Sequence, residues 1–570
     1  MIPFSQTLVE RHFPVTPTYN ETRKGLSLSV PKAGDFTPEE LVAMVLQHAV
    51  EISVKYAQES GSEIPPPSDI VLTVPSYCTQ IERKALLDAA DVAGLNVLTL
   101  IDETTAAALH YAMDKNFEED QIFLFYNLGA ASLQVNIVRL FQYEVKSGVG
   151  KPKSVPALQV LAKTWDSTLG GLAWDHVLVE YLADEFNKMW RKKSGDESKD
   201  IRSVQRPMTK IRLAANKAKH VLSANSEYFV GLDSLHDDVS LNLKVTREDL
   251  EKLAQPLLER AVKPVVDALA MAEITTANLT GVELLGGGMR VPSVQSKLAE
   301  ALAPVELGLH MNADESMALG AAFAGANVST AFRVRPVGMT DLTPFAQQIT
   351  LTNLPASTDE ESGSGWFRKS KSNSDAKKES EDDDWNKKTT LFKANSKMGI
   401  KKTIAFTHDK DVHCALDYVE ADTLASGTDL NLERYEVSGV AEFSKELSEK
   451  GLEGKPKVSL QFEMTPSGIT TLVKAEASME EVYTVQEEVE VDDDEDEKSS
   501  EETKTEEEES KEKPAEEAKD DSAEGEDAKN ETAEEEKPKK AKKKVMVDKV
   551  GNPESLFPYP RFVTSSSDHS

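Results

Sequence analysis

The sequence predicts an α/β fold up to residue 335, then an all-β region, then an acidic tract without regular structure. Three observations lead to this prediction. Helix-like and strand-like apolar patterns alternate before residue 335, and strict apolar–polar alternation replaces them afterwards. Residues 491–540 then hold 24 acidic residues, 9 basic residues and no aromatic residue, so they cannot bury enough apolar surface to offset chain entropy.

These changes in pattern divide the 570 residues into four parts. We expect an α/β domain over 1–335, a β domain over 336–490, an acidic disordered tract over 491–545 and a C-terminal stub over 546–570. Residues 356–388 are rich in Ser, Lys, Asp and Gly, which predicts a flexible insertion within the β domain.

The overall composition excludes several classes of protein. A net charge of −33 and a pI near 4.8 argue against a nucleic-acid or anionic-membrane partner. The cysteines of the sequence, Cys78 and Cys414, fall in different predicted domains, so neither a disulfide framework nor a cysteine metal site is expected. No apolar run approaches the roughly 18 residues that span a membrane, and the first residues lack a signal-peptide pattern. Composition alone therefore predicts a soluble protein that is not exported.

The first third of the chain alternates helices and strands. Thr37 is followed by Pro38 and Glu40, which is the pattern of a capped helix start, and apolar residues continue at helical spacing as far as Tyr56. In order after this helix, we expect a strand at Ile70–Val74, a helix from Thr79 to Gly94, a strand at Val97–Ile101, and a turn at Asp102–Thr105 into an alanine-rich helix ending at Met113.

The middle of the chain combines a hairpin with long helices. The predicted hairpin consists of Ile122–Tyr126 and Leu133–Leu140, joined by Asn127–Ser132. Pro256 and Pro264 predict kinks or breaks in the last helical segment. The helical segments are Trp174–Trp190, Lys210–Leu222 and Thr246–Ala272.

Strands dominate beyond Arg335. Apolar residues alternate over 412–418 and over 458–464, and the second run is followed by a turn at Thr465–Gly468 and by another alternating run. This pattern predicts antiparallel sheet with one buried face.

One glycine-rich stretch is the strongest candidate site. Val282–Leu285 is an apolar strand pattern, three glycines follow at 286–288, and a helical pattern begins at Val291. Glycines at a strand-to-helix turn let a ligand approach the backbone closely, and unpaired N–H groups at a helix start attract anions. The stretch suggests a nucleotide site, while a triple glycine also serves as a plain turn.

Several motifs, in order, resemble the heat-shock protein 70 superfamily. They are Val74-Pro75-Ser76-Tyr77, the run from Asp102 to Ala108, Thr168-Leu169-Gly170-Gly171, the stretch from Glu283 to Gln295, and the run from Asn312 to Ala322. Val221–Asn225 and Asn312–Glu315 are most similar to the large ER-lumenal branch, the hypoxia up-regulated protein-like chaperones. The resemblance implies an actin-like ATPase domain of two lobes, incomplete at its start, followed by an all-β sandwich. Such a sandwich holds extended polypeptide in the family, and a sandwich without an exposed groove would show the same periodicity.

The resemblance also implies site residues. ATP or ADP would be the ligand, Mg²⁺ would accompany it, and no residue is assigned as a metal ligand. Glu103 would be the catalytic polar group nearest the phosphates. Asn216 and His220 stand where the family's typical chaperones carry glutamate and arginine. The nucleotide-binding residues would be Gly129, Ala130, Gly170, Gly171, Asn216, Lys219, Ser223, Gly286, Gly287, Arg290 and Asp314.

The chain departs from the family pattern at its second phosphate loop. Asn127 and Gln134 replace two aspartates that help to hold magnesium and the attacking water. An amide cannot act as a base, and hard divalent cations favour charged oxygen ligands. Ala130 and Ala131 replace two glycines, while backbone N–H groups from Gly129 onward are still expected to meet phosphate. Whether the protein hydrolyses ATP is therefore an open question.

Two further features of the family are not found. Its first phosphate hairpin and catalytic lysine are missing before His12–Pro14, and its helical lid does not follow the acidic tract, so we expect both ends to be truncated. Asn-x-Ser/Thr triplets, which would matter only in a secretory compartment, occur at Asn20, Asn278, Asn327 and Asn530.

As the resemblance implies, the protein would be an ATP-binding stress-response chaperone of the ER lumen. It would hold unfolded polypeptides and promote nucleotide exchange on a conventional lumenal heat-shock chaperone. Three alternatives stay open at this point: a cytoplasmic location, an ATP-hydrolysing foldase, and a nucleotide-free interaction protein of the same fold.

Overall fold

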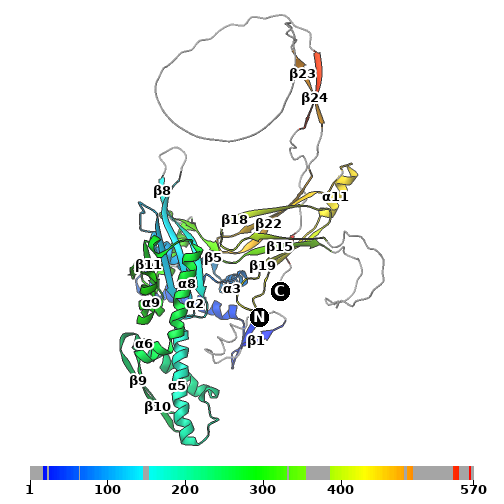
Figure 1. The fold of residues 1–570 in the computed structure, drawn as a ribbon. Helices are drawn as coiled ribbons and strands as arrows, with labels where there is room; N and C mark the ends of the chain where they lie inside the picture. The colour runs from blue at the N-terminus through cyan, green and yellow to red at the C-terminus, as the bar shows by residue number, and fades with distance from the viewer. Residues whose placement is uncertain are drawn as a thin grey trace, which may run out of the picture. The chain divides into compact units, whose positions relative to one another are not determined.

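A mixed sheet of six strands, in the order β12, β11, β6, β7, β8, β13, lies at the centre of the α/β part (Figure 1). Strands β6, β7 and β8 form an antiparallel meander, whereas β11 lies parallel to β6. The bounds are β6 (Gln121–Leu128), β7 (Leu133–Val145), β8 (Lys153–Asp166), β11 (Gly281–Leu285), β12 (Leu307–Gly308) and β13 (Gly338–Thr340).

The computed structural model describes residues 17–21, 25–62, 65–145, 153–329, 333–354, 385–452, 454–479, 484–491, 543–550 and 564–566. The chain forms two compact units, one of residues 1–478 with 559–570 and one of residues 479–558. No helix in the described part of the chain is both long enough and apolar enough to cross a membrane.

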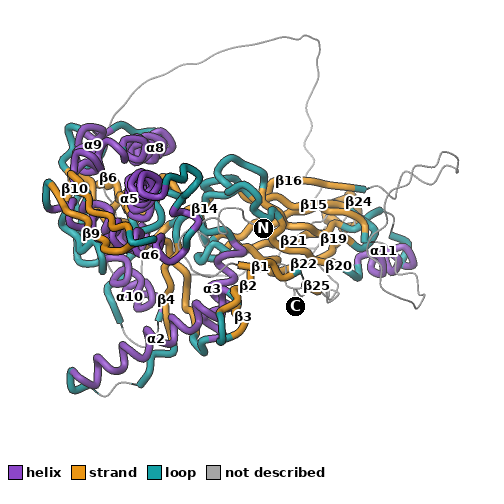
Figure 2. The backbone as a smooth tube through the Cα atoms, turned by 90° about the horizontal axis from the view of Figure 1, so that it is seen from below, coloured by secondary structure: helices purple, strands orange, loops and turns teal. Residues whose placement is uncertain are grey.

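Strand β6 separates two hydrophobic cores. Its even-numbered residues from Leu124 to Leu128 belong to one core, while Phe123 and Phe125 belong to the other. Both faces are apolar because helices cover both, as in buried central strands. Figure 2 shows α8 and α9 on one side of β6 and α10 on the other. The helices of these two layers are α4 (Glu103–Ala112), α5 (Gly171–Ser194), α6 (Gln205–Ala224), α8 (Gln255–Met271), α9 (Pro292–Leu302) and α10 (Ser316–Val328).

The first hundred residues contain the predicted alternation. Thr37 caps α2 (Pro38–Glu59) by accepting from the Glu40 N–H, and the Glu40 side chain bonds back to the Thr37 backbone, which confirms the predicted helix start. The segment continues with β4 (Asp69–Val74), α3 (Gln80–Val92) and β5 (Asn96–Asp102), and a small sheet of β1 (Pro17–Asn20), β2 (Gly25–Val30) and β3 (Gly34–Phe36) precedes it. Strand β5 runs directly into α4, so the turn expected at Asp102–Thr105 is wrong: Asp102 is the last strand residue and also the N-cap.

The helical segment predicted from Thr246 is interrupted as expected, but at one place only. Helix α7 (Arg247–Leu253) ends at Ala254, and α8 begins with Pro256 in its first turn, where a missing N–H costs nothing. Pro264 lies inside α8 without ending it. The remaining elements of this part are η1 (Ile201–Ser203), β9 (Glu227–His236), β10 (Val239–Thr246), η2 (Thr276–Asn278) and η3 (Gly287–Arg290).

Two antiparallel sheets enclose one core in the second half of the chain. The predicted runs 412–418 and 458–464 are confirmed as β19 (Val412–Tyr418) and β21 (Lys457–Met464). One sheet has the order β16 (Asn386–Phe392), β15 (Gln347–Asn353), β19, β20 (Asn431–Val437), β25 (Thr564–Ser566), and the other β18 (Ile400–Thr407), β21, β22 (Thr470–Ser478). Side chains of both sheets form a shared hydrophobic cluster. The short elements are β14 (Leu342–Thr343), β17 (Ser396–Lys397) and α11 (Val440–Glu449).

Two segments that the sequence predicts to be without regular structure have strands at their ends. Of the predicted insertion 356–388, residues 356–384 lie outside the described residues, and β16 begins at Asn386. In the second unit, β23 (Thr484–Val491) pairs antiparallel with β24 (Lys543–Val550), so the ends of the predicted tract 491–545 and the start of the predicted stub are strands. Valines recur at these ends, which favours strand over an unstructured chain. The part from 492 to 542 lies outside the described residues.

Four buried charged side chains join the α/β part to the β part. Lys163 of β8 contacts Asp102 and Asp341, each at 2.5 Å, and Arg83 of α3 donates to Asp102 at 2.7 Å. The exposed fractions are 0% for Lys163, 1% for Asp102, 2% for Arg83 and 8% for Asp341. We call these residues the buried ion cluster.

The buried ion cluster balances two positive charges against two negative ones. Burial alone would raise the pKa of Asp102, but the neighbouring Lys163 and Arg83 outweigh burial and lower it. Burial raises the pKa of Asp341, which Lys163 only partly opposes and Asp102 increases further. Asp341 also accepts from Thr105 at 2.9 Å, and Lys163 donates to the Leu342 carbonyl at 2.9 Å.

Replacing Lys163 by methionine is expected to lower the free energy of unfolding by about 3–5 kcal/mol, because it leaves two buried carboxylates with only Arg83. The double variant Lys163→Met/Asp341→Asn removes one charge of each sign and should be less destabilised than the single variant. Urea denaturation followed by circular dichroism measures both. Lys263→Ala, at an exposed pair with Asp267, is the control and should leave the transition unchanged. A single variant as stable as this control would contradict the role of the cluster.

Candidate functional site

The glycine stretch after β11 forms the predicted strand–turn–helix connection. The 3₁₀ turn η3 lies between the strand and α9, and α9 begins at Pro292 with Val291 as its N-cap, which confirms the predicted helix start. Gly286 has φ +81°, and a Cβ there would lie 2.4 Å from the Leu128 carbonyl oxygen. A Cβ at Gly288 would lie 2.5 Å from the Leu128 side chain, whereas one at Gly287 would meet nothing within 4 Å. Gly286 and Gly288 therefore permit close backbone packing, and Gly287 borders open space.

The loop between β6 and β7 packs against the start of α5. Gly171 and Leu172 donate backbone N–H groups to the carbonyls of Gly129 and Ala130, at 3.0 and 2.8 Å. A Cβ at Gly170 would lie 2.5 Å from the Ala130 backbone, so only glycine allows this contact. The Gly129 N–H donates to the Ser132 carbonyl at 3.0 Å. The expectation that N–H groups from Gly129 onward are open to phosphate is thus wrong for Gly129, because its donor is used inside the loop.

Helix α6 brings a lysine to the same place. Lys219 Nζ donates to the Gly171 carbonyl at 3.0 Å and pairs with Asp175 at 2.9 Å. Asn216, one turn earlier, donates to the other oxygen of Asp175 at 3.0 Å. Ser223 bonds the Lys219 carbonyl at 3.0 Å. Asp175 therefore fixes the Lys219 ammonium and the Asn216 amide relative to the start of α5.

These segments enclose a cavity of about 320 Å³, which we call the glycine-loop cavity. Eight of the predicted nucleotide-binding residues line it: Gly129, Ala130, Gly171, Asn216, Lys219, Ser223, Gly287 and Arg290. Gly170, Gly286 and Asp314 do not line it. Gly170 packs against the backbone of Ala130, and Gly286 packs against the backbone of Leu128. Asp314 accepts from Arg290 at 2.7 Å, and both side chains are exposed.

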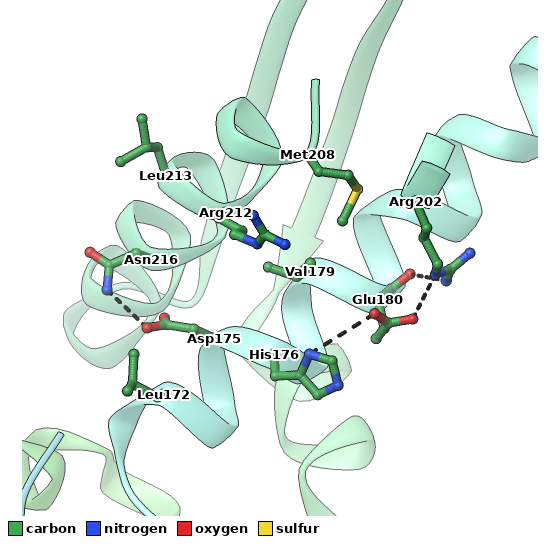
Figure 3. A pocket seen from close by; sticks show the side chains of 10 residues that line it. All are labelled: Leu172, Asp175, His176, Val179, Glu180, Arg202, Met208, Arg212, Leu213 and Asn216. Atoms are coloured by element: carbon green, nitrogen blue, oxygen red, sulfur yellow. Dashed lines mark hydrogen bonds and ion pairs between the residues drawn. The ribbon is translucent and has the colours of Figure 1, made fainter. Parts of the chain in front are cut away.

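A second cavity of about 560 Å³ adjoins the first between α5 and α6. It shares Leu172, Asp175 and Asn216 with the glycine-loop cavity. Figure 3 shows Asp175 bonded to Asn216 on one side of it, and Arg202 and His176 meeting Glu180 on the other. Apolar and polar side chains both line the two cavities, so together they suit a ligand that has an apolar part as well as charged or hydrogen-bonding groups.

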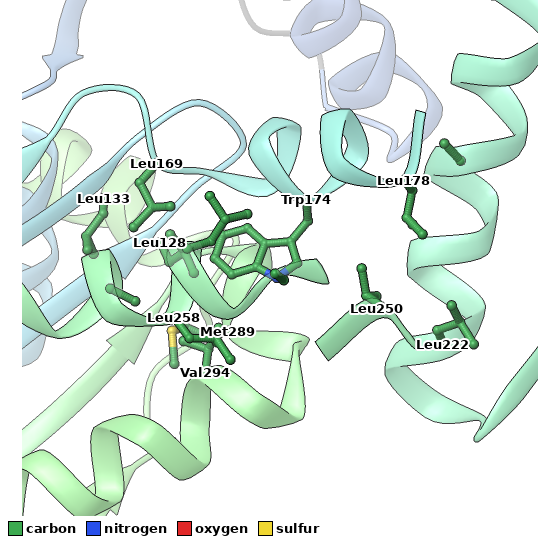
Figure 4. Close-up of a cluster of buried hydrophobic side chains, with 14 of the residues drawn as sticks. Leu128, Leu133, Leu169, Trp174, Leu178, Leu222, Leu250, Leu258, Met289 and Val294 are labelled. Atoms are coloured by element: carbon green, nitrogen blue, oxygen red, sulfur yellow. The ribbon is translucent and has the colours of Figure 1, made fainter. Parts of the chain in front are cut away.

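Trp174 forms the floor of the glycine-loop cavity. The side chain is 1% exposed and belongs to the large core, where Figure 4 shows it among Leu128, Leu258 and Met289. Its Nε1 is buried, and no hydrogen-bond partner for it is found within the described residues. Because Nε1 has almost no accessible surface, this unsatisfied donor belongs to the core and does not open into the cavity.

Glu103 contacts the end of the β6–β7 hairpin and does not line either cavity. Its Oε2 accepts from Asn127 at 3.2 Å and from Gln134 at 2.6 Å, residues that face each other across β6 and β7. The Gln134 Oε1 accepts from the Ser76 N–H at 2.8 Å, which fixes the amide orientation with Nε2 toward Glu103. Burial raises the pKa of Glu103, and the Gln134 bond opposes this rise. The Asn127 and Gln134 amides thus both donate to the Glu103 carboxylate.

The residues present fit a nucleotide better than a metal held by protein alone. Lys219 and Arg290 supply positive charge, and Gly287 leaves space beside the backbone. In the described part of the chain, no group of three or more His, Cys, Asp or Glu side chains could hold a metal ion. A Mg²⁺ ion would therefore rely on nucleotide phosphate oxygens and water, as Mg²⁺ often does.

Sequence reasoning missed several residues of the cavity. They are Leu172, Trp174, Asp175, Gly288 and Val291, and His220 was noted only as a departure from the family pattern. Trp174 and Asp175 lie in the first turn of α5, shortly after the glycine pair at 170–171. Their position next to a predicted nucleotide-binding motif could have identified them as residues of the site. From the sequence, Trp174 is predicted only as the start of a helical segment.

Comparison with known proteins gives a consistent result. The family model "Hsp70 protein" matches residues 4–382. "Heat shock 70 kDa protein 17" of Arabidopsis thaliana is 32% identical over 448 residues, 78% of this chain and 47% of the relative. "Hypoxia up-regulated protein 1" is 31% identical in Xenopus tropicalis (81% of this chain, 68% of the relative) and 31% identical in Homo sapiens (81% and 44%). The chain thus spans less than half the length of the plant and human relatives.

Replacing Glu103 by glutamine should stabilise the protein at neutral pH. Because the folded-state pKa of Glu103 is above its ordinary value of 4.5, the ionised side chain is a destabilising group once the pH exceeds that value. Glutamine keeps one oxygen that accepts from both amides, so Tm at pH 7 should rise by about 1–3 °C. The gain should vanish below pH 4.5, where the carboxyl is protonated in both states.

Glu103→Ala is the matched comparison. It leaves two amide donors without an acceptor and should lower the free energy of unfolding by about 1–3 kcal/mol. Differential scanning calorimetry from pH 4 to pH 8 measures both variants. An equal loss of stability in the glutamine variant at every pH would contradict the raised pKa.

Proposed function

The chain belongs to the Hsp70 family, and from this premise and the geometry of its site we propose a nucleotide-binding chaperone. In this proposal it acts in the ER lumen as a stress-response protein. It holds unfolded polypeptides and promotes nucleotide exchange on a conventional lumenal heat-shock chaperone. The hypoxia up-regulated protein 1 relatives, which match about four-fifths of the chain, support this branch of the family.

One observation carries the proposal. Lys219, Arg290 and Gly287 line the cavity, while Asn127 and Gln134 direct amide donors at Glu103. Neither amide can accept a proton from water, and the Glu103 oxygen that faces them is already engaged. The arrangement supports nucleotide binding without rapid hydrolysis, which suits a protein whose conformation, rather than turnover, is used.

In this proposal each part of the chain has its own role. Residues 1–335 form the nucleotide-binding domain, and 336–490 form a β-sandwich that holds polypeptide. The tract over 491–545 and the segment over 546–570 lie beyond it. Bound ATP or ADP would be held by Lys219, Arg290 and the glycine turn, with Trp174 beneath it, and Mg²⁺ would be carried with its phosphates. The nucleotide itself supplies the phosphate charge that these groups recognise.

Titration calorimetry with ADP and ATP tests the proposal. We expect one binding site per chain, and Arg290→Ala should weaken ADP binding about tenfold because it removes a charge-assisted contact. Lys297→Ala, on the exposed face of α9 and paired with Glu300, is the control and should bind as the native protein does. An ion pair at the protein surface contributes little to stability, so both variants should fold.

Two outcomes would replace the proposal. ATP turnover at a single site that Glu103→Ala abolishes would indicate a hydrolysing foldase. No heat of binding with either nucleotide, together with unchanged partner binding in Arg290→Ala, would indicate a nucleotide-free interaction protein.

A further inference from the structure

One of the Asn-x-Ser/Thr triplets has the geometry of a modification site. We infer that Asn278 carries an N-linked oligosaccharide. Asn278 ends η2, the short turn between α8 and β11, and the triplet is completed by Leu279 and Thr280. Asn278 and Thr280 are exposed, whereas Leu279 is buried and fixes the triplet to the core.

The two ends of the Asn278 amide have different environments. The Oδ1 accepts from the Thr275 N–H at 2.9 Å and from the Thr275 hydroxyl at 3.0 Å. These donors identify the oxygen, so the Nδ2 must point the other way. Among the described residues this nitrogen has no hydrogen-bond partner. The atom that would be glycosylated is therefore free in the folded protein, and the atom that caps the turn is not the one that reacts.

The reaction conserves these contacts. The Asn278 Nδ2 displaces the pyrophosphate of a lipid-linked oligosaccharide: an N–C bond forms at the first sugar carbon, the C–O bond to pyrophosphate breaks, and Nδ2 loses one proton. No oxidant or reductant is needed. The product is a secondary amide whose Oδ1 still accepts from Thr275. The Thr280 hydroxyl, the third element of the triplet, accepts from the Ile122 N–H at 3.1 Å.

Of the other triplets, the structure describes the one at Asn327 in full, and it has a different geometry. Asn327 lies in α10, and its Nδ2 donates to the Val337 carbonyl at 3.1 Å, so the reacting nitrogen faces protein rather than solvent. The triplet at Asn20 includes Thr22, which lies outside the described residues, as does Asn530. Asn278 is thus the triplet for which the folded structure gives positive support.

An oligosaccharide at Asn278 is also compatible with nucleotide binding. Asn278 precedes the first residue of β11, whereas Gly287 and Arg290 follow its last residue. Five strand residues separate the two ends by about 16 Å. The sugar would therefore leave the far end of the strand and not enter the glycine-loop cavity.

The inference rests on the lumenal location in the proposed function, and one experiment separates the two. The full chain is expressed in cultured animal cells behind a cleavable secretory leader, whose removal reports arrival in the lumen. We expect an endoglycosidase-sensitive mobility shift. Enzymatic release in H₂¹⁸O should convert residue 278 to ¹⁸O-labelled aspartate, which peptide mass spectrometry detects.

Matched variants locate the modification. Asn278→Gln and Thr280→Ala should abolish the label at residue 278, whereas Thr280→Ser should retain it. Asn327→Gln should leave it unchanged. ADP affinity should agree within twofold before and after removal of the sugar.

Leader-processed protein without modification at residue 278 would overturn the inference. The native protein, isolated from its own cells and carrying no added leader, gives the second test. Modification with the leader but none in the native protein would contradict both the lumenal location and the presence of the oligosaccharide on the native protein, and would show only that Asn278 can accept it.

Discussion

The buried ion cluster of Arg83, Asp102, Lys163 and Asp341 constrains the whole first unit. Its members come from α3, the end of β5, the last part of β8 and the residue before β14, which are far apart in the sequence. A buried charge without its partner costs several kcal/mol, so no member can leave the cluster alone. The segments that carry them must therefore assemble together, and Asp341 ties the first strands of the β part to the central sheet.

The cluster also adjoins the candidate site along the chain. Asp102 belongs to the cluster, and the next residue, Glu103, accepts from Asn127 and Gln134 at the end of the β6–β7 hairpin. The side chains of Asp102 and Glu103 have partners of different charge. Asp102 has two cations and keeps a lowered pKa, whereas Glu103 has only neutral donors and a raised one. Two adjacent carboxylates thus have opposite shifts because their partners differ in charge, not because one is buried and the other is not.

Local patterns predicted most of the elements, and tertiary contacts decided what they missed. Capping at Thr37, the alternation over 412–418 and the glycine turn after β11 are local signals, and each was confirmed. Lys163, by contrast, resembles an ordinary strand lysine in the sequence, and nothing near it in the chain indicates two carboxylates from distant segments. Trp174 was predicted only as the start of a helical segment, because its burial beside a cavity depends on the approach of separate loops.

The glycines of the site show why motif residues and cavity residues are not the same set. Gly170 and Gly286 do not border the cavity, yet a Cβ at either would lie within about 2.5 Å of a neighbouring backbone atom. Each lets one loop contact another: 170–172 against 129–131, and 286–288 against Leu128. A methyl group at either position would separate these loops and widen the cavity, even though it touched no ligand. Their requirement for glycine is thus a requirement of packing, and the cavity has its shape because the loops around it are in backbone contact.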